Sequence, residues 1–249
     1  MQEKKSYHKK TMTLLTIFCV FAIISAMYFG MKKNDSVKVW NQQSVLLSFV
    51  DDDATEKLIT DYYPILESRD IKGSVAAIMG TQNSRGFATK KQLLELQKQG
   101  WDILNHSCDV SSLAVKDAEE KLKFAKKIAV DSDFEAAKNI LVYPNGYTNK
   151  EIQTIVAHYF DYALGVEPFS NTLPLDRLEI DRFFVGSNEK DNLEQINAMM
   201  EHPCWIIVST HSANFDPSGF ERLVDSILEK DCQIVTVTEA IEMIEASEP

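Results

Sequence analysis

The stretch VLLSFVDDDA, residues 45–54, joins a mainly apolar run to three consecutive aspartates. Apolar residues at successive positions are typical of a strand that is buried on both faces, as in a parallel sheet. Polar residues that directly follow such a strand lie at its carboxyl end, where β/α barrels carry their chemistry. The stretch therefore predicts a buried parallel strand that ends at a functional site.

The chain around this stretch alternates strand candidates with segments of helical periodicity. The strand candidates are 45–50, 74–79, 101–105, 139–143, 162–166, 182–185, 204–209 and 233–237. The helix candidates are 55–67, 89–99, 115–130, 149–160, 191–201, 217–230 and 238–246, and Ser218 with Glu221 predicts a capping box for the sixth of them. Such alternation, without a glycine-rich phosphate-binding fingerprint, favours a closed or nearly closed β/α barrel of seven or eight strands over a doubly wound sheet.

The amino-terminal region differs from the rest of the chain. Residues 11–31 are 21 uncharged residues with two lysines on each side. At about 1.5 Å per residue they span roughly 31 Å as a helix, close to the hydrocarbon core of a bilayer. A cleaved signal peptide is the alternative, for which only Val20 and Ala22 approach the required small residues. We expect a retained transmembrane anchor, with a cytoplasmic tail at 1–10, a stem at 32–43 and a barrel domain at 44–249.

The charge distribution narrows the possible partners. The chain of 249 residues has a net charge of −11, but residues 1–33 carry six lysines against one glutamate. The remaining chain is therefore strongly acidic and would be repelled by phosphate backbones, which excludes nucleic acid as an expected partner. We expect the amino terminus of the anchor to lie in the cytoplasm, which places this acidic domain on the outer side of the cell membrane. Cys19 falls in the apolar run, and the other three cysteines predict no disulfide framework.

Polar residues follow three of the strand candidates directly. They are Asp51–Asp53, then Asn105, His106 and Ser107, and then Thr210 and His211. Each has an ordinary alternative, because Asp53 with Glu56 would suit a helix cap and a single histidine at a strand end is often structural. Together they offer one carboxylate and one imidazole as ligands of a divalent metal, and a second carboxylate and imidazole as general base and general acid. That combination suits metal-assisted hydrolysis.

Four motifs in this order resemble the NodB-type polysaccharide deacetylases, carbohydrate esterase family four. They are SFVDDDA at 48–54, GWDILNHSCDVSSL at 100–113, VYPNG at 142–146 and WIIVSTH at 205–211. The resemblance implies a distorted β/α barrel that uses a divalent metal to remove acetyl groups from sugar polymers. The chain departs from the family where Val110 replaces the second metal-binding histidine, and where Val142 and Asn145 replace an arginine and an aromatic residue.

The resemblance also assigns roles to individual residues. Because there are three aspartates where the family has two, the alignment of the first motif is open by one residue. The resemblance implies Asp52 as catalytic base, His211 as catalytic acid and the Asn145 backbone N–H as an oxyanion donor. It implies a metal, zinc by expectation, held by Asp53 and His106. Because Val110 has no donor atom, we expect a weak site, with Asp109, or less favourably Cys108, as a possible third ligand. Substrate-binding positions are Tyr143, Pro144, Gly146 and Arg182, and Trp101, Tyr147 and Phe215 are further aromatic residues expected near the barrel mouth.

These observations predict a membrane-anchored, metal-dependent hydrolase that removes N- or O-acetyl groups from an envelope or exported polysaccharide. The alternative is a NodB-like domain that has lost catalysis and binds a glycan or a partner in an envelope assembly. Val110 and Val142 favour the alternative, whereas the carboxylates and histidines at the strand ends favour the enzyme. A hydrolase without a metal, or with a different ligand set, is a third possibility.

Overall fold

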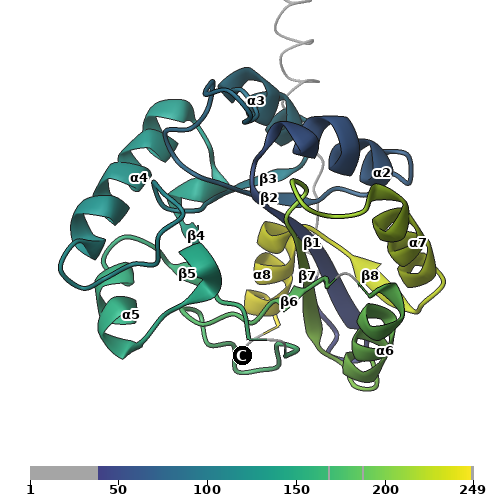
Figure 1. Ribbon diagram of the computed structural model, residues 1–249. Helices are drawn as coiled ribbons and strands as arrows, with labels where there is room; N and C mark the ends of the chain where they lie inside the picture. The colour runs from purple at the N-terminus through teal and green to yellow at the C-terminus, as the bar shows by residue number, and fades with distance from the viewer. Residues whose placement is uncertain (1–38, 168, 187, 248–249) are drawn as a thin grey trace, which may run out of the picture. The chain divides into compact units, whose positions relative to one another are not determined.

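Eight parallel strands and the helices between them form the part of the chain that begins at Val39 (Figure 1). The computed structural model describes residues 39–167, 169–186 and 188–247. The strands are β1 Val45–Asp53, β2 Ser74–Ala77, β3 Asp102–Asn105, β4 Ile140–Val142, β5 Tyr162–Leu164, β6 Phe183–Phe184, β7 Trp205–Thr210 and β8 Cys232–Ile234. The α-helices are α2 Tyr63–Glu67, α3 Lys90–Lys98, α4 Ala118–Ser132, α5 Lys150–Val156, α6 Glu189–Met199, α7 Pro217–Leu228 and α8 Val237–Glu245. Each predicted strand and helix is therefore present, with shifts at its ends.

Strand β1 is the centre of the sheet, whose order is β5-β4-β3-β2-β1-β7-β6, with β8 also pairing to β1. The carboxyl half of β1 pairs with β2, and its amino end pairs with β8. Strands β5 and β6 do not pair with each other, but Ile180, just before β6, exchanges backbone hydrogen bonds with Ala163 and Gly165 of the β5 edge. The architecture is an incomplete parallel β/α barrel, which confirms the predicted class without full closure.

Two apolar layers hold the strands in place. On β1, Leu46 and Val50 pack inside the barrel against residues of α8, whereas Leu47 and Phe49 pack outward in a cluster that includes residues of α7. All four side chains are fully buried. Burying such a side chain contributes roughly 1.5–3 kcal/mol, and these layers fix the direction in which each later residue of β1 points.

The helix starts differ from the predicted caps at two places. Helix α7 is capped by Asp216, whose carboxylate accepts the backbone N–H groups of Ser218 and Gly219, so the predicted Ser218–Glu221 capping box is wrong. A one-residue shift of the helix start accounts for this, because an aspartate before Pro217 is as good a cap as the serine after it. After β1, the helical segment that contains the π-helix Leu58–Tyr62 begins at Glu56, whose backbone N–H donates to the Gly86 carbonyl at 2.9 Å. Asp53 is therefore free of the capping role that was its alternative.

The predicted span 11–31, with its tail and stem up to residue 38, lies outside the described residues. Among the described residues, no helix is long and apolar enough to cross a bilayer. The described chain enters the barrel domain at its amino-terminal end, where the Trp40 backbone N–H donates to the Met243 carbonyl of α8. Cys108, Cys204 and Cys232 are free thiols.

Candidate active site

The three aspartates at the end of β1 point in different directions because side chains alternate along a strand. Asp51 follows the outward direction of Leu47 and Phe49, and Asp52 follows the inward direction of Leu46 and Val50. Asp53 has a left-handed backbone with φ +75°, which breaks the alternation. One run of identical residues thus supplies three carboxylates with separate surroundings.

Asp52 lies inside the barrel and is paired with a buried arginine. The Arg182 Nη1 atom is 2.8 Å from Asp52 Oδ1, and Arg182 Nε donates to the Gly165 carbonyl at 2.7 Å. Burial acts to raise the pKa of Asp52, but the charges of Arg182 and His106 oppose it, and the net shift is downward. Asp52 is therefore held ionised, which a proton acceptor requires.

Asp53 lies between the two histidines that follow strands β3 and β7. His106 Nε2 is 3.7 Å from Asp53 Oδ1, and His211 Nε2 is 4.0 Å from Asp53 Oδ2. His106 Nε2 is also 3.9 Å from Asp52 Oδ2. Because the carboxyl ends of parallel strands share one edge, residues far apart in the sequence meet here. The predicted grouping of Asp52, Asp53, His106 and His211 is present at this edge.

The register with Asp52 and Asp53 as the functional pair agrees with this geometry, since both carboxylates face His106. Ala54, at the family's glycine position, also has a left-handed backbone, with φ +55°. Left-handed φ is uncommon for residues other than glycine, and such conformations cluster at functional sites. The turn at 53–54 is what directs the Asp53 carboxylate toward the histidines.

His106 has the orientation of a metal-binding imidazole. Its Nδ1 atom lies 2.9 Å from the Val142 carbonyl, which can only accept, so Nδ1 donates to that carbonyl and Nε2 is the ring nitrogen that faces the carboxylates. Two ligands of a tetrahedral zinc lie about 3.4 Å apart when each bond is about 2.1 Å. The separation of 3.7 Å between His106 Nε2 and Asp53 Oδ1 fits a shared cation. Among the described residues, no group of three or more His, Cys, Asp and Glu side chains is arranged to hold a metal.

Asp109, the predicted third ligand, is engaged elsewhere. Its carboxylate lies 3.3 Å from Lys121 Nζ and accepts the Ser111 backbone N–H at 2.8 Å. Burial opposes the shift, but the Ser111 and Lys121 contacts lower the pKa of Asp109. Val110 is 60% exposed, and its carbonyl accepts from the Asn145 amide at 2.8 Å. Val110 and Asn145, two of the three departures from the family pattern, are therefore hydrogen-bonded to each other, and together with the Asp109 contacts they hold this loop without a metal.

The predicted substrate-binding residues lie mainly in the barrel wall. Tyr143 is fully buried, and its hydroxyl donates to the Leu178 carbonyl at 3.0 Å. Pro144 and Gly146 are also buried, and Arg182 pairs with Asp52 instead of facing solvent. Substrate contacts of Pro144, Gly146 and Arg182 stay a prediction. The Tyr143 ring, in contrast, has no exposed surface on which a sugar could stack. Asn145 is exposed, with φ +56°, and its oxyanion role stays a prediction as well.

The predicted aromatic residues divide between the two ends of the barrel. Tyr147 is 57% exposed, and Phe215 packs at 5.3 Å from the ring of Phe220. Trp101 immediately precedes β3 and is buried, so its predicted place near the mouth is wrong. The cause is strand direction, because residues that start a strand lie at the end opposite the site.

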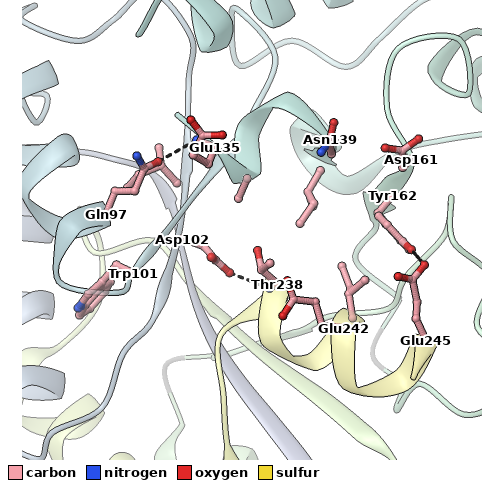
Figure 2. Close-up of a pocket in the computed structure, with 14 residues that line it drawn as sticks. Gln97, Trp101, Asp102, Glu135, Asn139, Asp161, Tyr162, Thr238, Glu242 and Glu245 are labelled. Carbon is pink, nitrogen blue, oxygen red and sulfur yellow. Dashed lines mark hydrogen bonds between the residues drawn. The ribbon is translucent and has the colours of Figure 1, made fainter. Parts of the chain in front are cut away.

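That opposite end carries a pocket of about 360 Å³, shown in Figure 2. Residues at the starts of β3, β4 and β5 line it together with α8, and Asp102, Asp161 and Glu242 make it acidic. Asp102 accepts the Thr238 backbone N–H at 2.8 Å. Trp101 lines this pocket, whereas the predicted catalytic, metal-binding and substrate-binding residues do not, so the pocket is separate from the carboxyl edge.

Sequence reasoning missed one part of the site, the role of Asp51. Its carboxylate accepts the Ser212 backbone N–H at 2.6 Å, and its Oδ2 atom is 2.8 Å from Ser212 Oγ. Thr210 Oγ1 donates to it at 3.1 Å. Burial raises the pKa of Asp51 to about 8. Strand alternation was a partial signal, since it places the adjacent Asp51 and Asp52 on opposite faces of the strand.

Comparison with known proteins places this site in a family. Residues 38–162, half of the chain, match the family model described as polysaccharide deacetylase. The chain belongs to the polysaccharide deacetylase family. The matched segment of this polysaccharide deacetylase contains Asp52, Asp53 and His106, whereas Arg182 and His211 come from the part of the barrel beyond it. No curated protein sequence matches the chain.

Solved structures share the fold over a longer stretch. The Streptococcus pyogenes deacetylase PplD in complex with acetate is 20% identical, with TM-score 0.55 over 62% of this chain and 70% of that one. A family 4 acetyl xylan esterase from Clostridium thermocellum in complex with a cobalt ion is 15% identical, with TM-score 0.58 over 78% and 89%. A mutant of BA3943, a CE4 family pseudoenzyme with restored enzymatic activity, is 13% identical, with TM-score 0.58 over 82% and 69%. The polysaccharide deacetylase family and fold indicate a hydrolytic deacetylase, and enzymes of this family are generally metal-dependent.

Proposed function

We propose that this polysaccharide deacetylase removes acetyl groups from a cell-envelope or exported glycan, using a divalent metal held by Asp53 and His106. The observation that carries the proposal is the meeting of an ionised Asp52 with His106, Asp53 and His211 at one edge of the barrel. A base, an acid and a pair of metal-binding side chains are the parts that metal-assisted acetyl hydrolysis requires.

The proposed catalytic role of each side chain follows from its surroundings. Asp52, kept ionised by Arg182, accepts the proton of the attacking water. His211 is 40% exposed and reaches the mouth, where it donates a proton to the departing sugar nitrogen or oxygen. An amine cannot leave as an anion at neutral pH, and imidazole is a donor with a suitable pKa. The bound metal, zinc by expectation, supplies polarisation of the acetyl carbonyl and of water.

The proposed location follows from the sequence at 1–33. The uncharged run at 11–31, flanked by lysines, supports an anchor in the cell membrane with the barrel on the outer side. An acetylated polysaccharide of the envelope is the substrate that a tethered external domain meets. Recovery from intact cells of a soluble form cut near Ala22 would contradict the anchor.

The test is acetate release from a panel of acetylated glycans by the full-length protein in detergent. Asp52→Asn and His211→Ala are each expected to lower turnover by about 100-fold or more, since each removes a general base or acid. The matched controls are Asp102→Asn and His158→Ala, a carboxylate at the other barrel end and an exposed histidine. Equal turnover by parent, Asp52→Asn and His211→Ala on a substrate that the parent deacetylates would refute the assigned roles.

A second candidate is a barrel that binds a glycan or an envelope partner without turnover. The exposed Val110 and the paired Asp109 support it, because they leave two predicted metal ligands instead of three. The name of the BA3943 structure shows that this fold also occurs in a pseudoenzyme. Glycan binding without acetate release, in protein loaded with zinc or cobalt, would favour this candidate over the enzyme.

A further inference from the structure

The backbone pairing of β1 with β7 ends at Asp51 and Thr210, and beyond that point the Asp51 side chain of β1 holds the loop that carries His211. Asp51 accepts a hydrogen bond from Thr210 Oγ1 on one side of His211 and from the Ser212 backbone N–H on the other. Ser212 Oγ is within hydrogen-bond distance of both Asp51 Oδ2, at 2.8 Å, and Thr55 Oγ1, at 3.2 Å. Both chain neighbours of His211 are therefore fixed to the strand that carries Asp52 and Asp53.

The His211 ring has weak support of its own. Its Nε2 atom is 4.0 Å from Asp53, beyond hydrogen-bond distance, and the ring stacks on Phe184 with centroids 5.0 Å apart. Its side chain is 40% exposed, whereas Thr210 and Ser212 are buried. The ring position thus depends on the backbone at 210–212, which Asp51 holds.

We propose that Asp51 is a positioning residue, which fixes the loop at 210–212 so that His211 faces Asp53 at the barrel mouth. This inference rests on the proposed function for its catalytic consequence, but the positioning itself is independent of turnover. The hydrogen bonds of Asp51 are with Thr210 and Ser212, and its side chain takes the outward direction of Leu47 and Phe49, whereas Asp53 faces the two histidines. It acts through the two residues beside His211.

A purely structural role for Asp51 makes a different prediction. Asp102 is a comparable carboxylate at the other end of the barrel, where it accepts a backbone N–H from Thr238 and a hydroxyl from Ser74. If Asp51 only stabilised the fold, loss of either carboxylate would lower stability and leave the turnover of the folded protein unchanged. If Asp51 positions His211, its loss lowers turnover and loss of Asp102 does not.

The first experiment compares kcat and KM for acetate release by Asp51→Ala, Asp51→Asn and Asp102→Ala. Asp51→Ala is expected to lower kcat by about 10- to 100-fold with KM changed less than about twofold, because misplacement of a catalytic group by about 1 Å costs about that much. Asn keeps an oxygen for the Ser212 N–H, so Asp51→Asn is expected to recover most of the parent kcat. Unchanged kcat in Asp51→Ala, or an equal loss in Asp102→Ala, would overturn the proposal.

The second experiment needs no activity, so it separates this inference from the proposed function. Stacking on Phe184 places the His211 ring protons in a ring current, and their chemical shifts are measured in histidine-labelled protein. Asp51→Ala is expected to move the His211 signals toward those of the exposed His158, and Asp102→Ala to leave them in place. If Asp51→Ala does not fold, Ser212→Ala removes one of the same hydrogen bonds and is measured instead. Parent-like His211 shifts in Asp51→Ala, or in Ser212→Ala where that variant is measured instead, would overturn the proposal even if acetate release is observed.

Discussion

Removal of the Arg182 guanidinium is the sharpest perturbation that the site offers. Arg182 and Asp52 are both almost fully buried, with side-chain exposures of 0% and 3%, and their ion pair spans 2.8 Å. Arg182→Leu leaves the Asp52 carboxylate buried without its partner, and breaking a buried pair in this way costs about 3–5 kcal/mol. The burial that already acts to raise the pKa of Asp52 would then be less opposed. We expect the variant to be less stable and to hold Asp52 with a higher pKa.

The assay is thermal unfolding of the parent and Arg182→Leu. For a domain of this size, 1 kcal/mol corresponds to about 2–4 °C, so the expected fall in Tm is roughly 6–20 °C. The matched control is Arg69→Leu, which breaks a pair with Asp225 whose carboxylate side chain is 55% exposed. Arg69 also pairs with Glu221 and is itself 15% exposed, but both partner carboxylates are more than half exposed, so water solvates the charges that Arg69→Leu leaves unpaired. The loss should therefore be clearly smaller than that of Arg182→Leu.

A double variant separates loss of charge pairing from loss of packing. Arg182→Leu with Asp52→Asn removes the unpaired charge, and it is expected to recover a large part of the Tm that Arg182→Leu loses, because a neutral amide is far less costly to bury than a carboxylate. Equal Tm losses for Arg182→Leu and Arg69→Leu, or no recovery in the double variant, would refute this reasoning.

Three further predictions test other parts of the barrel. Gly146 has φ +63°, and an added Cβ would lie 1.9 Å from a Val166 methyl, so Gly146→Ala should lower Tm by several degrees in thermal unfolding. Burial raises the pKa of Asp102, so the folded state keeps a proton that the unfolded state loses above about pH 4. Stability therefore falls as the pH rises from about 4 through the raised pKa of the folded state. Asp102→Asn should flatten the Tm-against-pH curve in this range. Cobalt titration should show tighter binding in Val110→His, which adds an imidazole donor, and little change in Asp109→Asn, because Lys121 and Ser111 already hold that carboxylate. A large loss of affinity in Asp109→Asn would show that Asp109 is a ligand.

The sequence by itself determined the elements of the fold, because their signals are local. Apolar runs identified the eight strands, polar residues directly after three of them identified the functional ends, and helical periodicity identified the helices between them. His106 and His211 were found in the same way, since a strand end is a position along the chain. Trp101 was misplaced because it stands at the start of a strand and not at its end.

Only the tertiary structure decided the partners of these residues, because partners come from distant parts of the chain. Arg182 lies 130 residues from Asp52 along the sequence, and Ser212 lies 161 residues from Asp51. Three adjacent aspartates look equivalent in the sequence, yet the sheet directs one to a buried arginine, one to two histidines and one to the loop at 210–212. The reason is physical: alternation sets which face each side chain takes, and the strands and helices packed on that face supply its charge, its hydrogen bonds and therefore its chemistry.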